Sequence, residues 1–151
     1  MRKFQFKLEP VEKLRKSREE DALRMLGEAQ RAQQVAIRHK SALVNELNQG
    51  LLRRENLAAA PTDPTIYKLE QDFITGQKQR IGQADQAILR AKRGLDKALR
   101  AYIHARRQLR MMEVLREKAH AEYRQHLLKH EKKEMDDLSI MRARLHREEL
   151  T

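Results

Sequence analysis

A seven-residue repeat of large apolar side chains runs through the second half of the chain. It consists of Tyr67, Ile74, Ile81, Ile88, Leu95, Tyr102, Leu109, Arg116 and Tyr123, in which only Arg116 is not apolar. Three residues after most of these positions stands a slim apolar side chain: Ala84, Ala91, Ala98, Ala105, Met112 and Ala119. Apolar residues at the a and d positions of a heptad make a helix supercoil with a partner helix. The pattern therefore predicts a long coiled-coil helix with a narrow seam.

Prolines divide the chain into two helical segments. Pro10 fits the first turn of a helix, where its missing amide proton is not needed. The stretch from Pro61 to Pro64 cannot continue a helix and marks a turn, with Thr65 as the expected N-cap of the second helix and Asp63 as a competing choice. We predict an all-α fold, an antiparallel two-helix coiled-coil hairpin forming one domain over residues 1–151. Its helices are expected at residues 8–59 and 65–149, with a turn at 60–65.

The first helix carries a looser apolar seam with spacings of mostly three and four. Its expected members are Leu8, Val11, Ala22, Met25, Ala29, Ala32, Ala36, Leu43, Leu47 and Leu57. Glycine costs about 1 kcal/mol against alanine inside a helix. We therefore expect the five glycines to mark points of close packing, with weak points in the helices as the alternative; they are Gly27, Gly50, Gly76, Gly82 and Gly94.

The two predicted helices differ in length, so the second must overhang the first. Folding the chain back at residue 62 pairs residue i with about 124 minus i, which brings Leu8 to the region of Arg116. Beyond that region the second helix keeps a scattered apolar stripe: Leu127, Leu128, Met135, Leu138, Met141 and Leu145. An unpartnered stripe of this kind is a candidate docking surface. The alternative is that the segment folds back as a short third helix.

Composition indicates a basic chain with acidic partners. Its net charge is +11, and 36% of its residues are charged, which favours binding to an acidic protein surface, nucleic acid or anionic lipid. The excess lies in Arg90, Lys92, Arg93, Lys97, Arg100, Arg106, Arg107, Arg110 and Arg116, opposed only by Asp96 and Glu113. The alternative is a solvated face containing pairs such as Asp96 with Arg100.

Several other properties exclude common classes of function. The chain has no cysteine and lacks a run of apolar residues long enough to span a bilayer, and its first residues lack the apolar core of a secretory signal. We therefore expect a cytoplasmic protein without direct membrane insertion. No phosphate-binding loop, nucleophile elbow or paired-carboxylate motif is present, so we expect no enzyme and no cofactor. His126 and His130 have a metal-ligand spacing but no further ligands, and we expect both to be solvated.

The segment Phe4-Gln5-Phe6-Lys7-Leu8-Glu9-Pro10-Val11-Glu12-Lys13-Leu14-Arg15 resembles the start of the flagellar export protein FliJ. There a Phe-x-Phe-x-Leu-x-x-Val-x-x-Leu-Arg pattern leads into the first helix. Residues 117–124 and 131–138 also look like the C-terminal helix of that family. This chain differs in being unusually basic.

The resemblance implies a stalk-like coiled coil in the centre of the hexameric export ATPase FliI. It also implies a link to the export gate protein FlhA, handling of export chaperones, and a peripheral position at the cytoplasmic face of the bacterial inner membrane. The equivalent stalk protein of a non-flagellar type III secretion system remains an alternative. So does a basic nucleic-acid-binding coiled coil, which is not expected because aromatic platforms do not accompany the basic residues.

Two sets of residues are the candidates for partner binding. We expect the ATPase ring to contact Phe4, Phe6, Leu8, Val11, Arg90, Arg93, Arg100, Arg107, Leu138, Met141 and Leu145. We expect the export gate to contact Ile66 and Phe73, which stand beside the seam near the turn. The alternative for these two residues is that they widen the seam.

Overall fold

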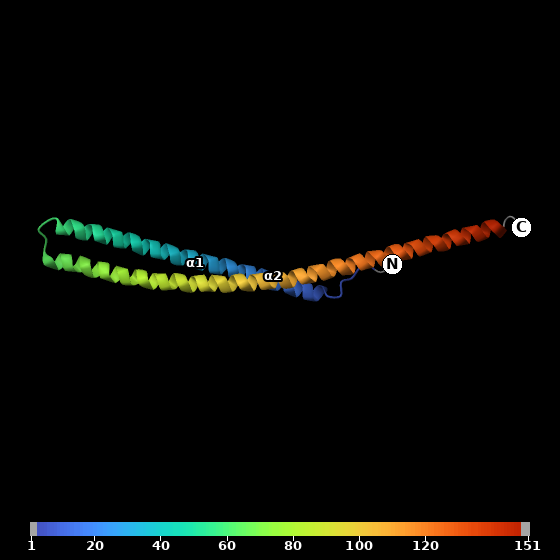
Figure 1. Ribbon diagram of the computed structural model, residues 1–151, viewed down its shortest axis with the longest axis horizontal. Helices are drawn as coiled ribbons and strands as arrows, with labels where there is room; N and C mark the ends of the chain where they lie inside the picture. The colour runs from blue at the N-terminus through green and yellow to red at the C-terminus, as the bar shows by residue number, and fades with distance from the viewer. Residues whose placement is uncertain (1–2, 149–151) are drawn as a thin grey trace. The chain divides into compact units, whose positions relative to one another are not determined.

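The structure is a computed structural model that describes residues 3–148. It contains two helices, α1 (Glu9–Ala58) and α2 (Pro64–Glu148), which form an antiparallel hairpin (Figure 1). The predicted fold class is confirmed, and the described helix ends lie within one residue of the predicted ones; predicted residue 149 lies outside the described part. The chain forms two compact units, one joining residues 3–18 to 106–148 and the other comprising residues 19–105.

The turn is closed by side chains at both helix ends. The Thr65 backbone N–H donates to Asp63 Oδ1 at 3.0 Å, so Asp63 and not Thr65 is the N-cap of α2. This follows from Pro64 occupying the first helical position, where proline is favoured. At the end of α1 the Thr62 hydroxyl donates to the carbonyl oxygens of Leu57 and Ala60, both at 3.0 Å.

The heptad of α2 forms the seam. Ile74 and Ala84 are 1% and 4% exposed in the unit of residues 19–105, and Leu109 and Met112 are 5% and 3% exposed in the other unit. The remaining predicted seam positions from Ile81 to Tyr123 are half-buried except Arg116, which is exposed. Tyr67 is 41% exposed, so its predicted place in the seam is wrong; the first buried a position of the heptad is Ile74.

The seam of α1 differs from the prediction. Met25 is 61% exposed, whereas its neighbour Leu26 is 8% exposed, and the predicted members Leu8, Val11 and Ala32 are also exposed. One set of buried and half-buried residues instead follows an alternating spacing of three and four: Glu12, Arg15, Glu19, Ala22, Leu26, Ala29, Gln33, Ala36, Lys40, Leu43, Leu47, Gly50, Arg54 and Leu57. Gly27, Val44 and Leu51 are half-buried beside this seam. Six members of the alternating set are charged or amide residues. Their alkyl stems can cover apolar surface while their polar ends reach the edge of the seam.

Polar contacts between the helices confirm the predicted register. The prediction paired residue 40 with residue 84 and residue 53 with residue 71. In the structure Lys40 Nζ lies 2.6 Å from Asp85 Oδ1, and Arg53 Nη2 lies 3.0 Å from Glu70 Oε1. In the other unit Arg15 Nη1 donates to the Gln108 carbonyl oxygen at 3.1 Å. Exposed pairs of this kind contribute only about 0–1 kcal/mol each, so they report the register more than they stabilise it.

One buried polar side chain interrupts the apolar seam. Gln77 is 1% exposed and stands at a d position of α2. Its Nε2 donates to a carboxylate oxygen of Glu46, and its Oε1 accepts a hydrogen bond from Arg80 at 3.3 Å. A hydrogen-bonded polar layer inside a coiled-coil seam favours one register over others.

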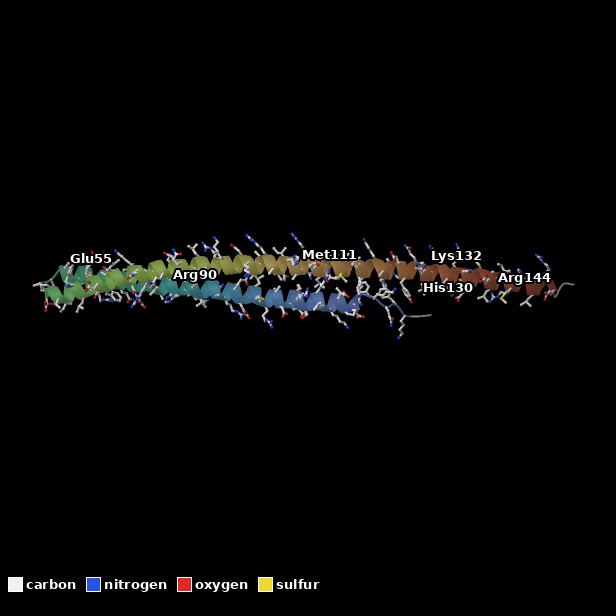
Figure 2. All side chains as sticks on the ribbon, turned by 90° about the horizontal axis from the view of Figure 1, so that it is seen from below. Glu55, Arg90, Met111, His130, Lys132 and Arg144 are labelled. Carbon is white, nitrogen blue, oxygen red and sulfur yellow. The ribbon has the colours of Figure 1, made fainter. Side chains whose placement is uncertain are left out.

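The last part of α2 continues beyond the paired region. Residues 128–148 are helical and exposed throughout, and Figure 2 shows the side chains of Lys132 and Arg144 projecting from this segment. The alternative that the segment folds back as a third helix is therefore wrong. Over residues 3–148, neither helix contains an apolar stretch that could cross a membrane.

Candidate partner-binding surfaces

The N-terminal arm, residues 3–8, packs against α2. The Phe4 ring meets the His120 ring edge-on, with centroids 5.0 Å apart and planes at 89°, and lies 5.5 Å from the Tyr123 ring. Such aromatic pairs contribute about 0.5–1.5 kcal/mol beyond the area they bury. Phe4 and Phe6 are both half-buried. The arm is thus held by aromatic contacts in which Tyr123, a seam residue, meets Phe4.

A groove, here called the terminal groove, lies between this arm and α2. It is lined by Lys3, Phe4, Gln5, Phe6, Lys7, Leu8, Leu115, Ala119, Glu122, Tyr123 and His126. Three of the residues predicted to bind the ATPase therefore line one groove, namely Phe4, Phe6 and Leu8. Val11 does not line the groove and is 38% exposed.

The overhang residues form a separate surface. Leu138, Met141 and Leu145 are 56%, 62% and 62% exposed. At 1.5 Å rise per residue, Leu138 lies about 22 Å along the helix from Tyr123. Phe4 lies against His120, as the predicted pairing of residue i with about 124 minus i requires. The terminal groove and the overhang residues are therefore two separate surfaces along α2.

An unpaired cationic stripe lies on α2 in the unit of residues 19–105. It consists of Arg90, Arg93, Lys97 and Arg100, which are all exposed and recur every three or four residues, so they share one helix face. No described carboxylate forms an ion pair with any of the four. The pair of Asp96 with Arg100, named in the alternative of a solvated face, is therefore not formed, and the four basic side chains lie at the surface without a described ion-pair partner.

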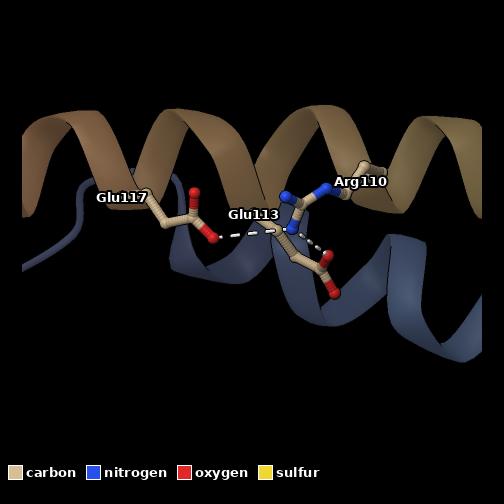
Figure 3. Close-up of polar contacts among 3 residues, drawn as sticks. All are labelled: Arg110, Glu113 and Glu117. Atoms are coloured by element: carbon tan, nitrogen blue, oxygen red, sulfur yellow. Dashed lines mark hydrogen bonds and ion pairs between the residues drawn. The ribbon is translucent and has the colours of Figure 1, made fainter.

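The basic residues farther along α2 are largely compensated. Arg110 Nη1 lies 3.2 Å from Glu113 Oε2 and 3.5 Å from Glu117 Oε1 (Figure 3). The hydrogen bond to Glu113 and the charge of Glu117 raise the pKa of Arg110 above its usual range. Arg116 pairs with Glu12 at 2.9 Å. Arg107, by contrast, is exposed and has no ion pair among the described residues.

Ile66 and Phe73 have different surroundings near the turn. Ile66 is 49% exposed and is free to contact another molecule. Phe73 is half-buried, and the Arg53 guanidinium lies over its ring, 5.3 Å from the centroid. A Cβ atom placed on Gly50 would lie 2.9 Å from Phe73 Cε1, so the Phe73 ring fills the space above that glycine.

Sequence reasoning missed an apolar depression on α2. It is lined by Arg107, Arg110, Met111, Val114 and Leu115, and Figure 2 shows Met111 on the surface of α2. These residues stand outside the seam heptad, and the signal that could have indicated them is their spacing of three and four on a second face of the helix.

Residues 3–148 contain no group of three or more side chains arranged to hold a metal ion. His130, one of the two histidines with ligand spacing, lies 3.2 Å from Glu134 Oε1.

Comparison with known proteins identifies the family. The family model for the flagellar FliJ protein matches residues 4–148. A solved structure described as that of a YscO homolog, CT670, from Chlamydia trachomatis has the same fold. The TM-score is 0.64 at 16% identity, covering 97% of this chain and 99% of that one. No curated protein matches. The family match spans nearly the whole chain, and we conclude that the protein belongs to the FliJ family, the non-enzymatic structural components of flagellar protein export.

Proposed function

We propose that this chain is the stalk that occupies the centre of the hexameric export ATPase FliI and links it to the export gate protein FlhA. In this proposal it also handles export chaperones, and it acts in the cytoplasm at the inner face of the inner membrane. The observation that carries the proposal is the cationic stripe at Arg90, Arg93, Lys97 and Arg100, which has no described counter-charge. An acidic lining inside a protein ring is a partner that complements it.

Apolar contacts would hold the stalk in the ring. The terminal groove offers Phe4, Phe6 and Leu8, with Val11 exposed nearby in sequence. The overhang offers Leu138, Met141 and Leu145, each more than half exposed. Arg93, Arg100 and Arg107 would add charge complementarity, which speeds association and fixes orientation more than it adds affinity.

Near the turn between α1 and α2, we propose that Ile66 contacts the export gate. Phe73 belongs to the same proposed surface through the exposed part of its half-buried ring, which also packs beside Gly50 and under the Arg53 guanidinium. In this proposal the export ATPase and the export gate contact separate parts of the chain.

The direct test is to mix the purified chain with its cognate ATPase and to measure binding and hydrolysis together. We expect a stable complex and a changed hydrolysis rate. The variant Leu145→Ser should weaken the complex, whereas Leu52→Ser, at a similarly exposed leucine of α1 (60% against 62% exposed), should not. Absence of both binding and an effect on hydrolysis would refute the proposal.

A basic nucleic-acid-binding function is the second candidate, because the cationic stripe would also attract phosphates. Binding to nucleic acid releases counterions, so its affinity falls steeply as the salt concentration rises. Titration with DNA and with the ATPase at two salt concentrations separates the two functions. ATPase binding that persists at a salt concentration where DNA binding is lost supports the stalk.

The alternative of a non-flagellar secretion stalk is tested in cells. A flagellated strain lacking its own FliJ-family protein should regain swimming when it expresses this chain. Rescue of secretion in a non-flagellar system, without rescue of swimming, would favour the alternative.

A further inference from the structure

The apolar depression on α2, here called the outer socket, lies on a face that the hairpin does not use. Its apolar residues Met111 and Leu115 are 57% and 43% exposed, whereas the seam residues Leu109 and Met112 are 5% and 3% exposed. Because an α-helix makes one turn every 3.6 residues, the socket positions lie on the side of α2 opposite the seam. Neither the arm nor α1 contributes a residue to its lining.

The lining residues have the spacing of a hole in a coiled coil. Arg107, Arg110, Met111 and Val114 stand at positions i, i+3, i+4 and i+7 of α2. Four residues at this spacing form the hole that receives one side chain, the knob, of a facing helix in a coiled coil. Met111 and Val114 make one side of this hole apolar, so the knob that fits it is aliphatic.

The charges around the socket define the rest of the partner. Arg107 at one end and Lys118, four residues beyond Val114, are exposed and have no ion pair within the described part of the chain. Arg110 is instead held by Glu113 and Glu117 at 3.2 and 3.5 Å (Figure 3). Two free cations therefore bracket the apolar hole, and they complement carboxylates on both sides of the knob.

We propose that the outer socket docks an acidic amphipathic α-helix of another protein, with an aliphatic knob between Met111 and Val114 and carboxylates facing Arg107 and Lys118. A helix is the occupant because the hole has coiled-coil spacing. A second copy of this chain fits poorly, because it would bring a molecule of net charge +11 against a cationic face. This inference goes beyond the proposed stalk function, since it concerns a partner helix seated on Met111 and Val114. It shares Arg107 with the proposed ATPase contacts, and its test with a peptide needs no ATPase.

The probe is a synthetic helical peptide three heptads long, with leucine at one position of each heptad and glutamate on both sides of it. Fluorescence anisotropy measures its binding to the full chain. We expect binding that weakens as salt is raised. We also expect the affinity to fall at least about tenfold when the leucines of the peptide are replaced by alanine or its glutamates by lysine. Equal binding of all three peptides, or no binding of the first, would overturn the proposal.

Two matched variants place the site on the chain. Met111→Glu puts a carboxylate into the socket and should weaken peptide binding by at least about tenfold. Met25→Glu makes the same change at a methionine of similar exposure, 61% against 57%, and should leave binding unchanged. Arg107→Gln should reduce affinity several-fold and flatten the salt dependence. An equal loss in both methionine variants would place the binding elsewhere and overturn the assignment.

Sedimentation of the chain alone separates the partner helix from a second copy. We expect a monomer whose mass is unaffected by Met111→Glu. A dimer that dissociates in this variant would show that the socket is filled by another molecule of the same chain, against the proposal.

Discussion

Gly50 is the glycine that packs against side chains of the opposite helix, because the Phe73 ring lies beside the position that its Cβ would take. The added atom would lie 2.9 Å from Phe73 Cε1. At Gly76, Gly82 and Gly94 nothing lies within 4 Å of such an atom, and at Gly27 only the end of Arg31 does. The expectation of close packing is therefore confirmed at Gly50 and wrong at the other four positions.

This difference predicts opposite effects of the same substitution. Gly50→Ala should lower the free energy of unfolding by about 1–2 kcal/mol, because overpacking outweighs the gain in helix propensity. Gly94→Ala should raise the same free energy by about 0.5–1 kcal/mol. Urea unfolding followed by circular dichroism measures both. A gain in stability at position 50 would mean that the Phe73 ring moves aside at little cost.

The residues that sequence reasoning misplaced share a physical cause. The hydrophobic pattern in α1 selected Met25, yet Leu26 faces α2 and Met25 is 61% exposed. The true seam includes Arg15, Lys40 and Arg54. Because these side chains are charged, hydropathy alone does not show the regular heptad of α1. In α2 the seam is nearly all apolar, and the pattern was sufficient to place it.

At the scale of the elements, the hairpin is held in one register. Lys40 Nζ lies 2.6 Å from Asp85 Oδ1, which is within reach of a zero-length crosslinker that joins amines to carboxylates. Treatment with a carbodiimide followed by mass spectrometry should give a Lys40–Asp85 crosslink within the monomer. A slip by one heptad would bring Lys40 to Lys78 or Lys92, where no such bond can form, so absence of this crosslink would contradict the register.

The overhang should be the least protected helical part of the chain. Residues 128–148 are exposed throughout and have no partner helix to stabilise them, so their hydrogen bonds open locally. Amide hydrogen exchange should therefore be much faster there than at Ile74 or Leu109, which are 1% and 5% exposed. Removal of the overhang after Leu127 should leave the unfolding temperature of the hairpin within about 2 °C. A larger fall would show that the overhang packs against the hairpin.

Element boundaries and the pairing of the terminal arm were predictable, whereas the details of its ring contacts were not. Prolines fix where helices end, because their effect on the backbone is local. The contact of Phe4 with His120 follows from the predicted register, in which residue 4 pairs with residue 120. The edge-on geometry of these rings and the contact with Tyr123 depend on side-chain packing that no local pattern encodes. The cationic stripe was recognisable because its residues are close in sequence.

At the scale of the whole molecule, the net charge of +11 raises the question of whether partners respond to total charge or to its placement. Two double variants separate these effects. Arg93→Glu with Arg100→Glu reverses charge in the stripe of α2, and Arg31→Glu with Arg38→Glu does so at exposed positions of α1. Both pairs remove the same amount of charge, and neither pair involves an ion pair among the described residues.

If the position of the charges determines affinity, the α2 variant should bind the export ATPase at least about tenfold more weakly than the α1 variant at low salt. The reason is that charge pairs act over short distances. The difference should shrink as salt is raised towards 0.5 M, where the screening length falls to about 4 Å. Binding curves at several salt concentrations provide the measurement. Equal weakening by both variants would mean that the ring responds only to total charge, and the stripe would then have no specific role in docking.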